Sequence, residues 1–320
     1  MSRLDEDNNA KVSLVILTYK YINNALKLAS DLKKYVDEVI IINFNDKYPD
    51  KVNESNFKII TLPDLGVSFY WYKYIISLVR NDWIVVLEDD YEVSPLLLEK
   101  LRMKLQTSRA KAYRIYRINT YTGSMQPVIL IFRKDVVIPN CVIHNHYFIT
   151  SPYEDLSEDP KLFIIHKEEK LFNMKKIKKY TCIESYQIGY LVLKMVRSNG
   201  QYYNIEGRSF NISKYIPNII KNLALKNKIV LFLLIIFFIN IRSIISNISI
   251  LNSKINLRSK VISILYNTIY NTYLLLYVFR ETRRKLDIYY QAYLRGDFCA
   301  NTITDQPPYA QCLKTKRVTH

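Results

Sequence analysis

The chain has 320 residues, 49% of them hydrophobic, which is enough to bury the core of one full domain and an extension. This composition excludes a protein that is disordered throughout. The formal net charge of +17 predicts anionic partners: nucleic acid, nucleotide phosphates or the surface of an anionic membrane.

Short apolar runs rich in β-branched residues alternate with amphipathic stretches in the first third of the chain. The predicted strands are Val12–Thr18, Glu38–Asn43, Phe57–Leu62 and Trp83–Glu88. The predicted helices are Asn23–Val36 and Ser68–Arg80. This alternation predicts an α/β fold with a mainly parallel sheet, in which ligands bind at the carboxyl ends of the strands.

The pattern changes in the middle of the chain. The stretches "KAYRIYRINTY" and "PVILIFRKDVVIP" predict antiparallel or edge strands, and helical periodicity returns from Glu168 to about Arg197. We place the end of the α/β domain at residue 210, a basic and apolar helical region at 211–298, and a disordered tail at 299–320.

The helical region mixes long aliphatic stretches with regularly returning lysines and arginines. Its uninterrupted apolar core, Ile229–Ile239, is shorter than the roughly 20 residues that cross a bilayer. We therefore expect a helix that lies in the interface of an anionic membrane. The alternative is an ordinary helical subdomain whose basic residues face water.

The four cysteines are scattered without a CxxC pair, at Cys141, Cys182, Cys299 and Cys312. This spacing indicates neither a zinc site nor a disulfide framework and favours a reducing compartment. The first residues are acidic and lack the pattern of a secretory signal. We therefore expect the protein at the cytoplasmic face of a membrane, held peripherally or monotopically.

Three consecutive acids end the fourth predicted strand, in "WIVVLEDDYEVSP". Because side chains alternate along a strand, Glu88 and Asp90 point to one side and Asp89 to the other. Two carboxylates on one side suit Mg²⁺ or Mn²⁺, which would hold the phosphates of a nucleotide. The alternative is that the acids only cap a helix that starts near Ser94.

Two long stretches carry a family resemblance: "VSLVILTYKYINNALKLASDLKKYVDEVIIINFND" and "LGVSFYWYKYIISLVRNDWIVVLEDDYEVSP". Together they resemble the family 2 glycosyltransferases of the GT-A fold, in the branch that builds lipopolysaccharide-core and similar cell-surface glycans. The middle stretches "YRINTYTG", "PVILIFRKDVVIPNCVIHNHYFI" and "LFIIHKEEKLFNMKKIKKYTCIES" match in the same order. The resemblance covers roughly Lys11 to Ser185.

The resemblance implies a Rossmann-like GT-A domain that transfers a sugar, with inversion, from a nucleotide-sugar donor to a hydroxyl of a glycan or lipid-linked acceptor. Glu88 and Asp90 then occupy the Asp-x-Asp positions that bind the metal and the donor diphosphate. The residues expected to contact the donor are Thr18, Tyr19, Asn43, Asp46, Lys73, Glu88, Asp89 and Asp90.

Two positions depart from the family pattern. Asn43 stands where relatives carry an aspartate that contacts the base, and Asn145 stands where they carry the acid that serves as general base. The candidates that could accept the proton instead are His144, His146, Glu154 and Asp155. His166 is interpreted as a structural or phosphate contact.

The departures leave a second interpretation open, a catalytically silent homologue that binds a glycan or a nucleotide. A nucleic-acid-binding protein is the third, suggested by the charge and the many tyrosines. Nucleic acid is not expected as a partner, because the basic residues cluster beside aliphatic segments and no recognised binding motif occurs.

Overall fold

The computed structural model describes residues 10–19, 21–45, 57–65, 67–120, 125–142, 145–156, 159, 162–167, 173–197, 217–252, 257–295, 297–300 and 307–313. The chain divides into two compact units. The first contains residues 1–138, 147–169 and 203–208, and the second contains residues 139–146, 170–202 and 209–320.

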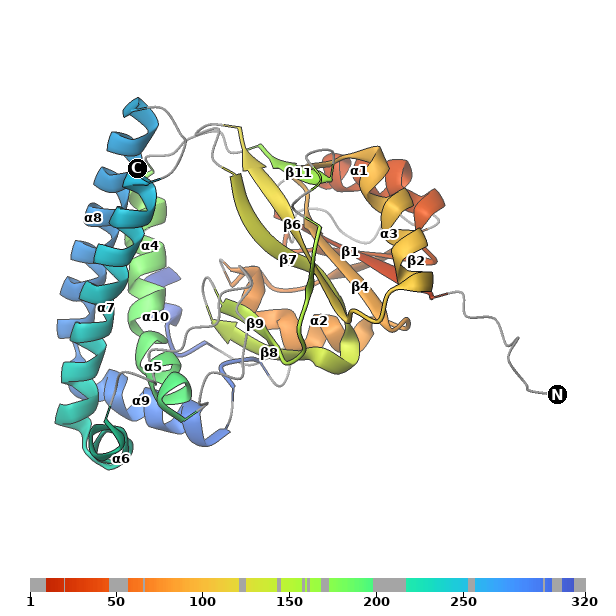
Figure 1. Cartoon of the computed structure of the whole chain (residues 1–320). Coiled ribbons are helices and arrows are strands. Elements are labelled where there is room, and N and C mark those ends of the chain that lie inside the picture. Colours follow the sequence, from red (N-terminus) through yellow and green to blue (C-terminus); the bar gives the residue numbers. More distant parts are fainter. Residues whose placement is uncertain are drawn as a thin grey trace, which may run out of the picture. The chain divides into compact units, whose positions relative to one another are not determined.

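A nine-stranded mixed sheet forms the first unit, in the order β3-β2-β1-β4-β7-β6-β11-β5 with β10 also on β6 (Figure 1). Its parallel part consists of β1 (Val12–Thr18), β2 (Glu38–Asn43), β3 (Lys58–Thr61) and β4 (Trp83–Glu88). These bounds confirm the predicted strands, and the parallel pairing confirms the predicted class of sheet.

Beyond β4 the strand directions alternate. β7 (Met125–Arg133) pairs antiparallel with both β4 and β6 (Ala112–Asn119), as the pattern after Leu105 predicts. β11 (Phe163–His166) is parallel to β6, and β5 (Tyr91–Val93) is antiparallel to β11. Three strands remain. β10 (Glu154–Asp155) pairs with β6, and β8 (Val137–Val142) and β9 (Asn145–Ile149) form a separate two-stranded sheet.

One face of this sheet is covered by two helices, α1 (Ile22–Leu32) and α3 (Pro95–Thr107). The apolar side of α1 repeats at helical spacing and packs with alternate residues of β1 and β4 into a single core cluster. Helix α2 (Tyr72–Leu78), preceded by a 3₁₀ turn at Ser68–Trp71, lies on the other side of the sheet in Figure 1. Burial of both sheet faces explains why the parallel strands are almost entirely apolar.

The second unit is helical. It contains α4 (Met174–Ser185), α5 (Ile188–Arg197), α6 (Asn218–Lys226), α7 (Lys228–Leu251), α8 (Leu257–Phe279), α9 (Thr282–Arg295) and α10 (Ala310–Leu313). Its core joins α5, α7, α8 and α9. Because α5 packs into this core, the second unit includes residues 170–202, and the predicted boundary at residue 210 lies too far along the chain.

The sequence predicts one short apolar segment, whereas the structure contains two long apolar helices. α7 has 24 residues and an 18-residue stretch with a mean hydropathy of 2.5, and α8 has 23 residues and an 18-residue stretch with a mean hydropathy of 1.3. By length and composition alone, each is long enough to cross a membrane. The difference arises because the polar residues of α7 after Ile239 still fit a continuous helix.

Two disulfides, Cys141–Cys299 and Cys182–Cys312, correct the expectation of unpaired cysteines. The partners are 158 and 130 residues apart, so their proximity arises only from the folded helical unit and not from local spacing. The expected disordered tail is also wrong for part of its length: Cys299 and Tyr309 are fully buried, and α10 is helical.

Peptide mapping without reduction should recover both disulfides and no free thiol. Replacing Cys182 and Cys312 together by serine should lower the free energy of unfolding by about 2–4 kcal/mol, because the cross-link restricts a long loop of the unfolded chain. Thermal unfolding monitored by circular dichroism measures the change. Recovery of four free thiols from the natively folded protein would contradict the pairing.

Candidate functional site

The parallel register brings the ends of four strands to one edge of the sheet. Thr18 is aligned with Asn43, Asn43 with Thr61, and Leu17 with Glu88. On the other half of the sheet, β6 and β11 end in register at the same edge, where His166 is aligned with Asn119. The carboxyl edge therefore collects the polar residues that follow buried strands.

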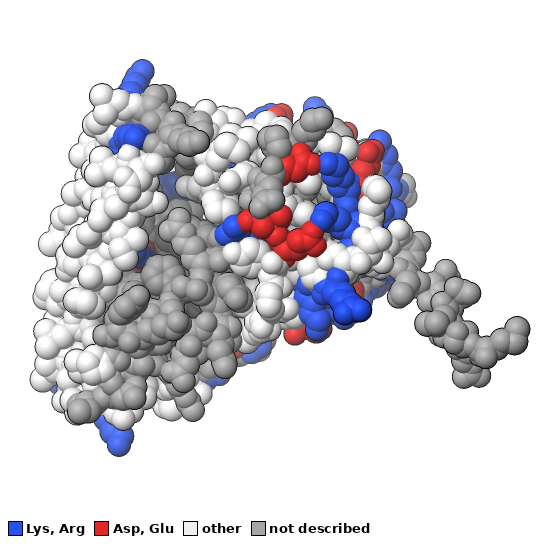
Figure 2. Space-filling model, in the orientation of Figure 1, with Lys and Arg blue, Asp and Glu red and all other residues white. Residues whose placement is uncertain are grey.

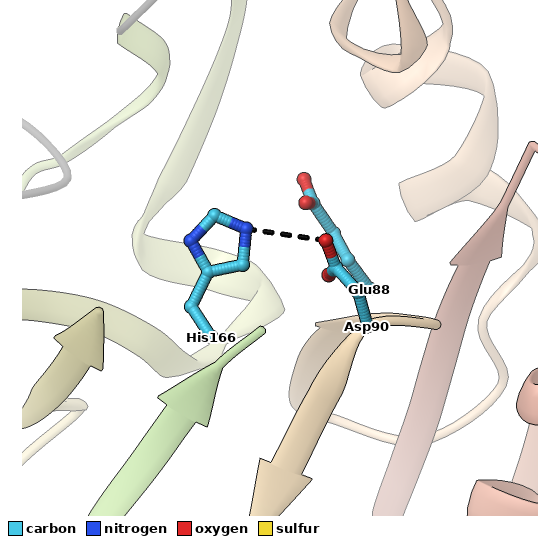
Figure 3. Close-up of side chains that lie close together, drawn as sticks. All are labelled: Glu88, Asp90 and His166. Atoms are coloured by element: carbon cyan, nitrogen blue, oxygen red, sulfur yellow. Dashed lines mark hydrogen bonds and ion pairs between the residues drawn. The ribbon is translucent and has the colours of Figure 1, made fainter. Parts of the chain in front are cut away.

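Glu88, Asp90 and His166 meet at this edge (Figure 3). Each offers one ligand atom, and the three atoms lie within 4.8 Å of one another. His166 Nε2 is 3.2 Å from Asp90 Oδ2. Within the part of the chain that the structure describes, this is the one group of three or more His, Cys, Asp or Glu side chains close enough to share a metal ion.

Two strand pairings place His166. β5 starts directly after the acids, and its Tyr91 is aligned with His166 on β11. The Lys167 N–H donates to the Asp90 carbonyl at 3.0 Å, and the rings of Tyr91 and His166 meet edge to face at 5.2 Å between centroids. The imidazole is only 15% exposed, so packing fixes its direction toward the carboxylates.

The negative charges of Glu88 and Asp90 are only partly compensated by the described residues around them. Asp90 Oδ1 is buried and has no hydrogen-bond partner among the described residues. Burial raises the pKa of Glu88, the neighbouring Asp90 charge raises it further, and His166 and Arg117 partly offset the rise. Two close carboxylates, an unsatisfied oxygen and an imidazole fit a small divalent cation such as Mg²⁺ or Mn²⁺.

Asp89 points away from this cluster, as strand alternation predicts. Its Oδ2 accepts a hydrogen bond of 2.6 Å from the Thr18 hydroxyl, and backbone N–H groups of Tyr21 and Tyr19 also bond to its carboxylate. Burial raises the pKa of Asp89, and these hydrogen bonds oppose the rise. Asp89 therefore fastens the loop after β1 to the tip of β4.

The other expected donor contacts are spread along the same edge or lie outside the described residues. Asn43 is buried and bonds the backbone of Asn45 with both side-chain atoms, and the Tyr19 ring stacks on Phe44 at 4.7 Å. Lys73 is exposed on α2. Asp46 is not among the described residues.

The structure does not bring Glu154 or Asp155 to the acid cluster. β10 pairs with Tyr113 and Arg114 at the start of β6, whereas His166 is aligned with Asn119 at its end. Glu154 binds Lys104 and Ser108, which lower its pKa, and Asp155 is paired with Arg114. His144 and the side chain of His146 lie outside the described residues.

Three residues near this edge were not predicted from the sequence to lie beside the acids or at the donor edge: His166, Arg117 and Thr61. His166 was interpreted as a structural or phosphate contact, and its position depends on a pairing between distant strands. Arg117 donates to the Tyr91 hydroxyl at 3.3 Å and to Gln126 Oε1 at 2.7 Å, and its charge reaches Glu88. Thr61 Oγ1 is buried without a partner among the described residues. A polar residue at the end of a buried strand is the one signal that could have indicated them.

No family model and no curated protein matches this chain. A solved structure of S. aureus TarS residues 1–349 in complex with UDP-GlcNAc is 12% identical, with a TM-score of 0.39, and the match covers 90% of this chain and 93% of that one. A longer TarS structure is matched over only 39% of its length, with a TM-score of 0.36.

A mannosyltransferase, PcManGT from Pyrobaculum calidifontis in complex with GDP-Man and Mn²⁺, is 10% identical with a TM-score of 0.37. That match covers 91% of this chain and 90% of the mannosyltransferase. Similarities with such low identities and TM-scores do not assign a function to this chain, so its function is inferred from the residues of the site.

Asp90→Asn should abolish a metal-dependent rise in melting temperature without lowering the melting temperature of the metal-free protein. The substitution removes a ligand and also the charge that raises the pKa of Glu88. Titration calorimetry with Mn²⁺ should show affinity reduced more than tenfold, about 1.4 kcal/mol or more.

The matched control is Glu92→Gln. Glu92 lies two residues further along, is half exposed and is paired with Lys167 outside the cluster. We expect it to bind Mn²⁺ as the wild type does. Equal loss in both variants would mean that general surface charge, and not the cluster, attracts the ion.

Proposed function

We propose that the chain is a metal-dependent glycosyltransferase of the GT-A type, which moves a sugar from a nucleotide-sugar donor to a hydroxyl group. The observation that carries this proposal is the cluster of Glu88, Asp90 and His166 at the carboxyl edge of a mainly parallel sheet, with one buried and unsatisfied carboxylate oxygen. Ligands of open α/β sheets bind at this edge. The family resemblance of the first 185 residues supports the same activity.

In this proposal Glu88, Asp90 and His166 hold Mg²⁺ or Mn²⁺. Held by these residues, such an ion would supply positive charge that stabilises a nucleoside diphosphate as the leaving group. Around it, Asp89 and Thr18 fix the loop after β1, where the resemblance places the nucleotide. Tyr19, Asn43 and Thr61 lie along the edge that would bind the base and ribose, and Arg117 offers a second positive group beside Glu88.

The proposed acceptor is a glycan or a lipid-linked sugar at an anionic membrane. The helical unit supports a peripheral or monotopic association through its apolar helices and basic residues. The expected cytoplasmic face rested in part on unpaired cysteines and in part on the acidic first residues. The two disulfides remove the first of these supports, because disulfides persist mainly in oxidising compartments.

A screen of nucleotide sugars with the full-length protein tests the donor proposal. We expect one donor to raise the melting temperature only when Mn²⁺ or Mg²⁺ is present, and to release nucleoside diphosphate when a glycan or lipid-linked acceptor is added. Asp90→Asn should lose both effects and Glu92→Gln should keep them. Metal-dependent stabilisation without release would favour the silent homologue, and no stabilisation by any donor would contradict the proposal.

His144 and His146 remain our proposal for the group that accepts the proton of the attacking hydroxyl. With a histidine base, transfer should fall as pH decreases through about 6–7, where imidazole becomes protonated. Replacing the active histidine by glutamine should reduce the rate by roughly 10²–10⁴-fold.

Glu154→Gln is the control for the histidine variants, since Glu154 is held by Lys104 and Ser108 away from the cluster. Its rate and its pH profile should match the wild type. If His144→Gln and His146→Gln both keep the wild-type rate and the same acid limb, the histidine proposal is wrong.

A further inference from the structure

The outward sides of α7 and α8 carry two matching apolar stripes. The exposed stripe of α7 consists of Ile229, Leu233, Phe237, Asn240, Ile244, Ile248 and Leu251. The exposed stripe of α8 consists of Leu257, Val261, Leu265, Thr268, Thr272, Leu276 and Phe279. In both, successive members are separated by 4, 4, 3, 4, 4 and 3 positions. This spacing is close to the helical period, so each stripe runs along one side of its helix for about 33 Å.

Neither stripe contains an ionisable side chain. The single charged residue between Ile229 and Leu251 is Arg242, whose guanidinium turns inward to Glu184 of α4 and to Asn271 Oδ1 of α8. Figure 2 shows the face over α7 and α8 as white from end to end, with Lys and Arg atoms at its two ends. An exposed apolar face of this length is rare on a soluble monomer and indicates a partner.

The polar side chains within the stripes form hydrogen bonds inside their own helices, which lowers the cost of placing them in an apolar environment. Asn240 Nδ2 donates to the Ile236 carbonyl at 2.8 Å, and the hydroxyls of Thr268 and Thr272 donate to carbonyls one turn earlier at 2.8 and 2.9 Å. Each of these three side chains therefore already donates one hydrogen bond within its own helix. The desolvation of these positions is therefore inexpensive.

The distribution of charge selects an anionic lipid surface over a second copy of the chain. Residues 1–169 carry 22 Lys and Arg against 23 Asp and Glu, whereas residues 170–320 carry 24 against 6. The half of the chain with the apolar stripes thus has a formal charge of +18. Two such halves would repel each other, whereas each basic residue near an anionic membrane gains about 1 kcal/mol.

Helix α4 argues against a crossing of the bilayer. It runs beside α8, since Glu184 accepts a 2.6 Å hydrogen bond from the Tyr270 hydroxyl and Lys178 Nζ lies 5.5 Å from the centre of the Tyr273 ring. Its exposed side chains include Lys175, Lys176 and Lys178. If α8 crossed the membrane, these lysines would lie at the depth of the hydrocarbon, at a cost of about 2.5–3.5 kcal/mol each by insertion scales.

We propose that α7 and α8 lie side by side in the headgroup and acyl boundary of an anionic bilayer, with both stripes in contact with lipid and without crossing it. The basic ends of the helices then meet anionic headgroups, and α4 stays on the aqueous side. This inference concerns the helical unit and does not depend on the proposed transfer reaction.

Flotation of the full-length protein with phosphatidylcholine vesicles, with and without 30% phosphatidylglycerol (roughly the anionic content that attracts basic segments), tests the surface. We expect strong flotation with the anionic vesicles, less with neutral ones, and a decrease at high salt. The triple variant Ile244→Gln, Ile248→Gln and Leu265→Gln should bind at least tenfold more weakly, since all three side chains are more than half exposed. Circular dichroism of the variant checks that its helices are intact.

Met103→Gln is the control, because Met103 is an apolar residue on α3 of the other unit that is more exposed than any of the three. It should bind vesicles as the wild type does. If the triple variant also binds like the wild type, the stripes are not the lipid contact. A wild-type dimer that the triple variant disrupts, together with absent lipid binding, would assign the stripes to a second copy.

Depth measurements distinguish a helix that lies flat from one that crosses. A fluorophore is attached to a single cysteine introduced at Ile229, Asn240 or Leu251, which are the two ends and the middle of the α7 stripe. Quenchers attached to the lipids at known depths then measure the depth of each fluorophore in the bilayer. A flat helix places all three at the same shallow depth. If Asn240→Cys lies near the bilayer centre and both ends lie near the surfaces, α7 crosses the membrane and the proposal is wrong.

Discussion

The antiparallel pairing of β5 with β11 is the constraint on which the candidate site depends. β4 alone delivers two carboxylates on one side of its tip, an arrangement that many solvated loops share. The pairing of Tyr91 with His166 adds an imidazole 76 positions further along the chain and holds it 3.2 Å from Asp90. The pairing therefore turns two neighbouring carboxylates into a cluster of three possible ligands, two carboxylates and one imidazole.

The three acids at this edge lie in different electrostatic environments. Asp89, which faces β1, is satisfied by the Thr18 hydroxyl and by backbone N–H groups, and so stabilises the fold. Among the described residues no donor reaches one buried oxygen of Asp90, and the pKa of Glu88 is raised, so both acids leave the fold less stable than it could be. Asp89 and Asp90 are adjacent in the turn that follows β4, yet Asp89 is held by the loop after β1 whereas Asp90 lies beside Glu88 and His166.

Local patterns were sufficient for the parallel half of the sheet and for the direction of the three acids. A strand that is buried on both faces appears in the sequence as an apolar run of the same length. For this reason β1, β2 and β4 match their predicted bounds. The position of His166, the distance of Glu154 from the cluster and the two disulfides depend on contacts between residues 41 to 158 positions apart. No periodicity encodes such contacts, so single-sequence reasoning had no signal for them.

The helical unit uses polar residues in two contrasting ways along the same pair of helices. On the inner side, Arg242 of α7 binds both Glu184 of α4 and Asn271 of α8, and Asn267 donates to Asn247 Oδ1 at 2.6 Å. These bonds require one register of α7 against α8, because any shift would leave a buried charge unpaired at a cost of several kcal/mol. On the outer side, Asn240, Thr268 and Thr272 each donate one hydrogen bond to a carbonyl of their own helix. The inner side of the two helices therefore carries the polar contacts that fix their register, and the polar groups of the outer side bond within their own helix. This division allows the helical unit to keep its structure when its outer side moves from water into lipid.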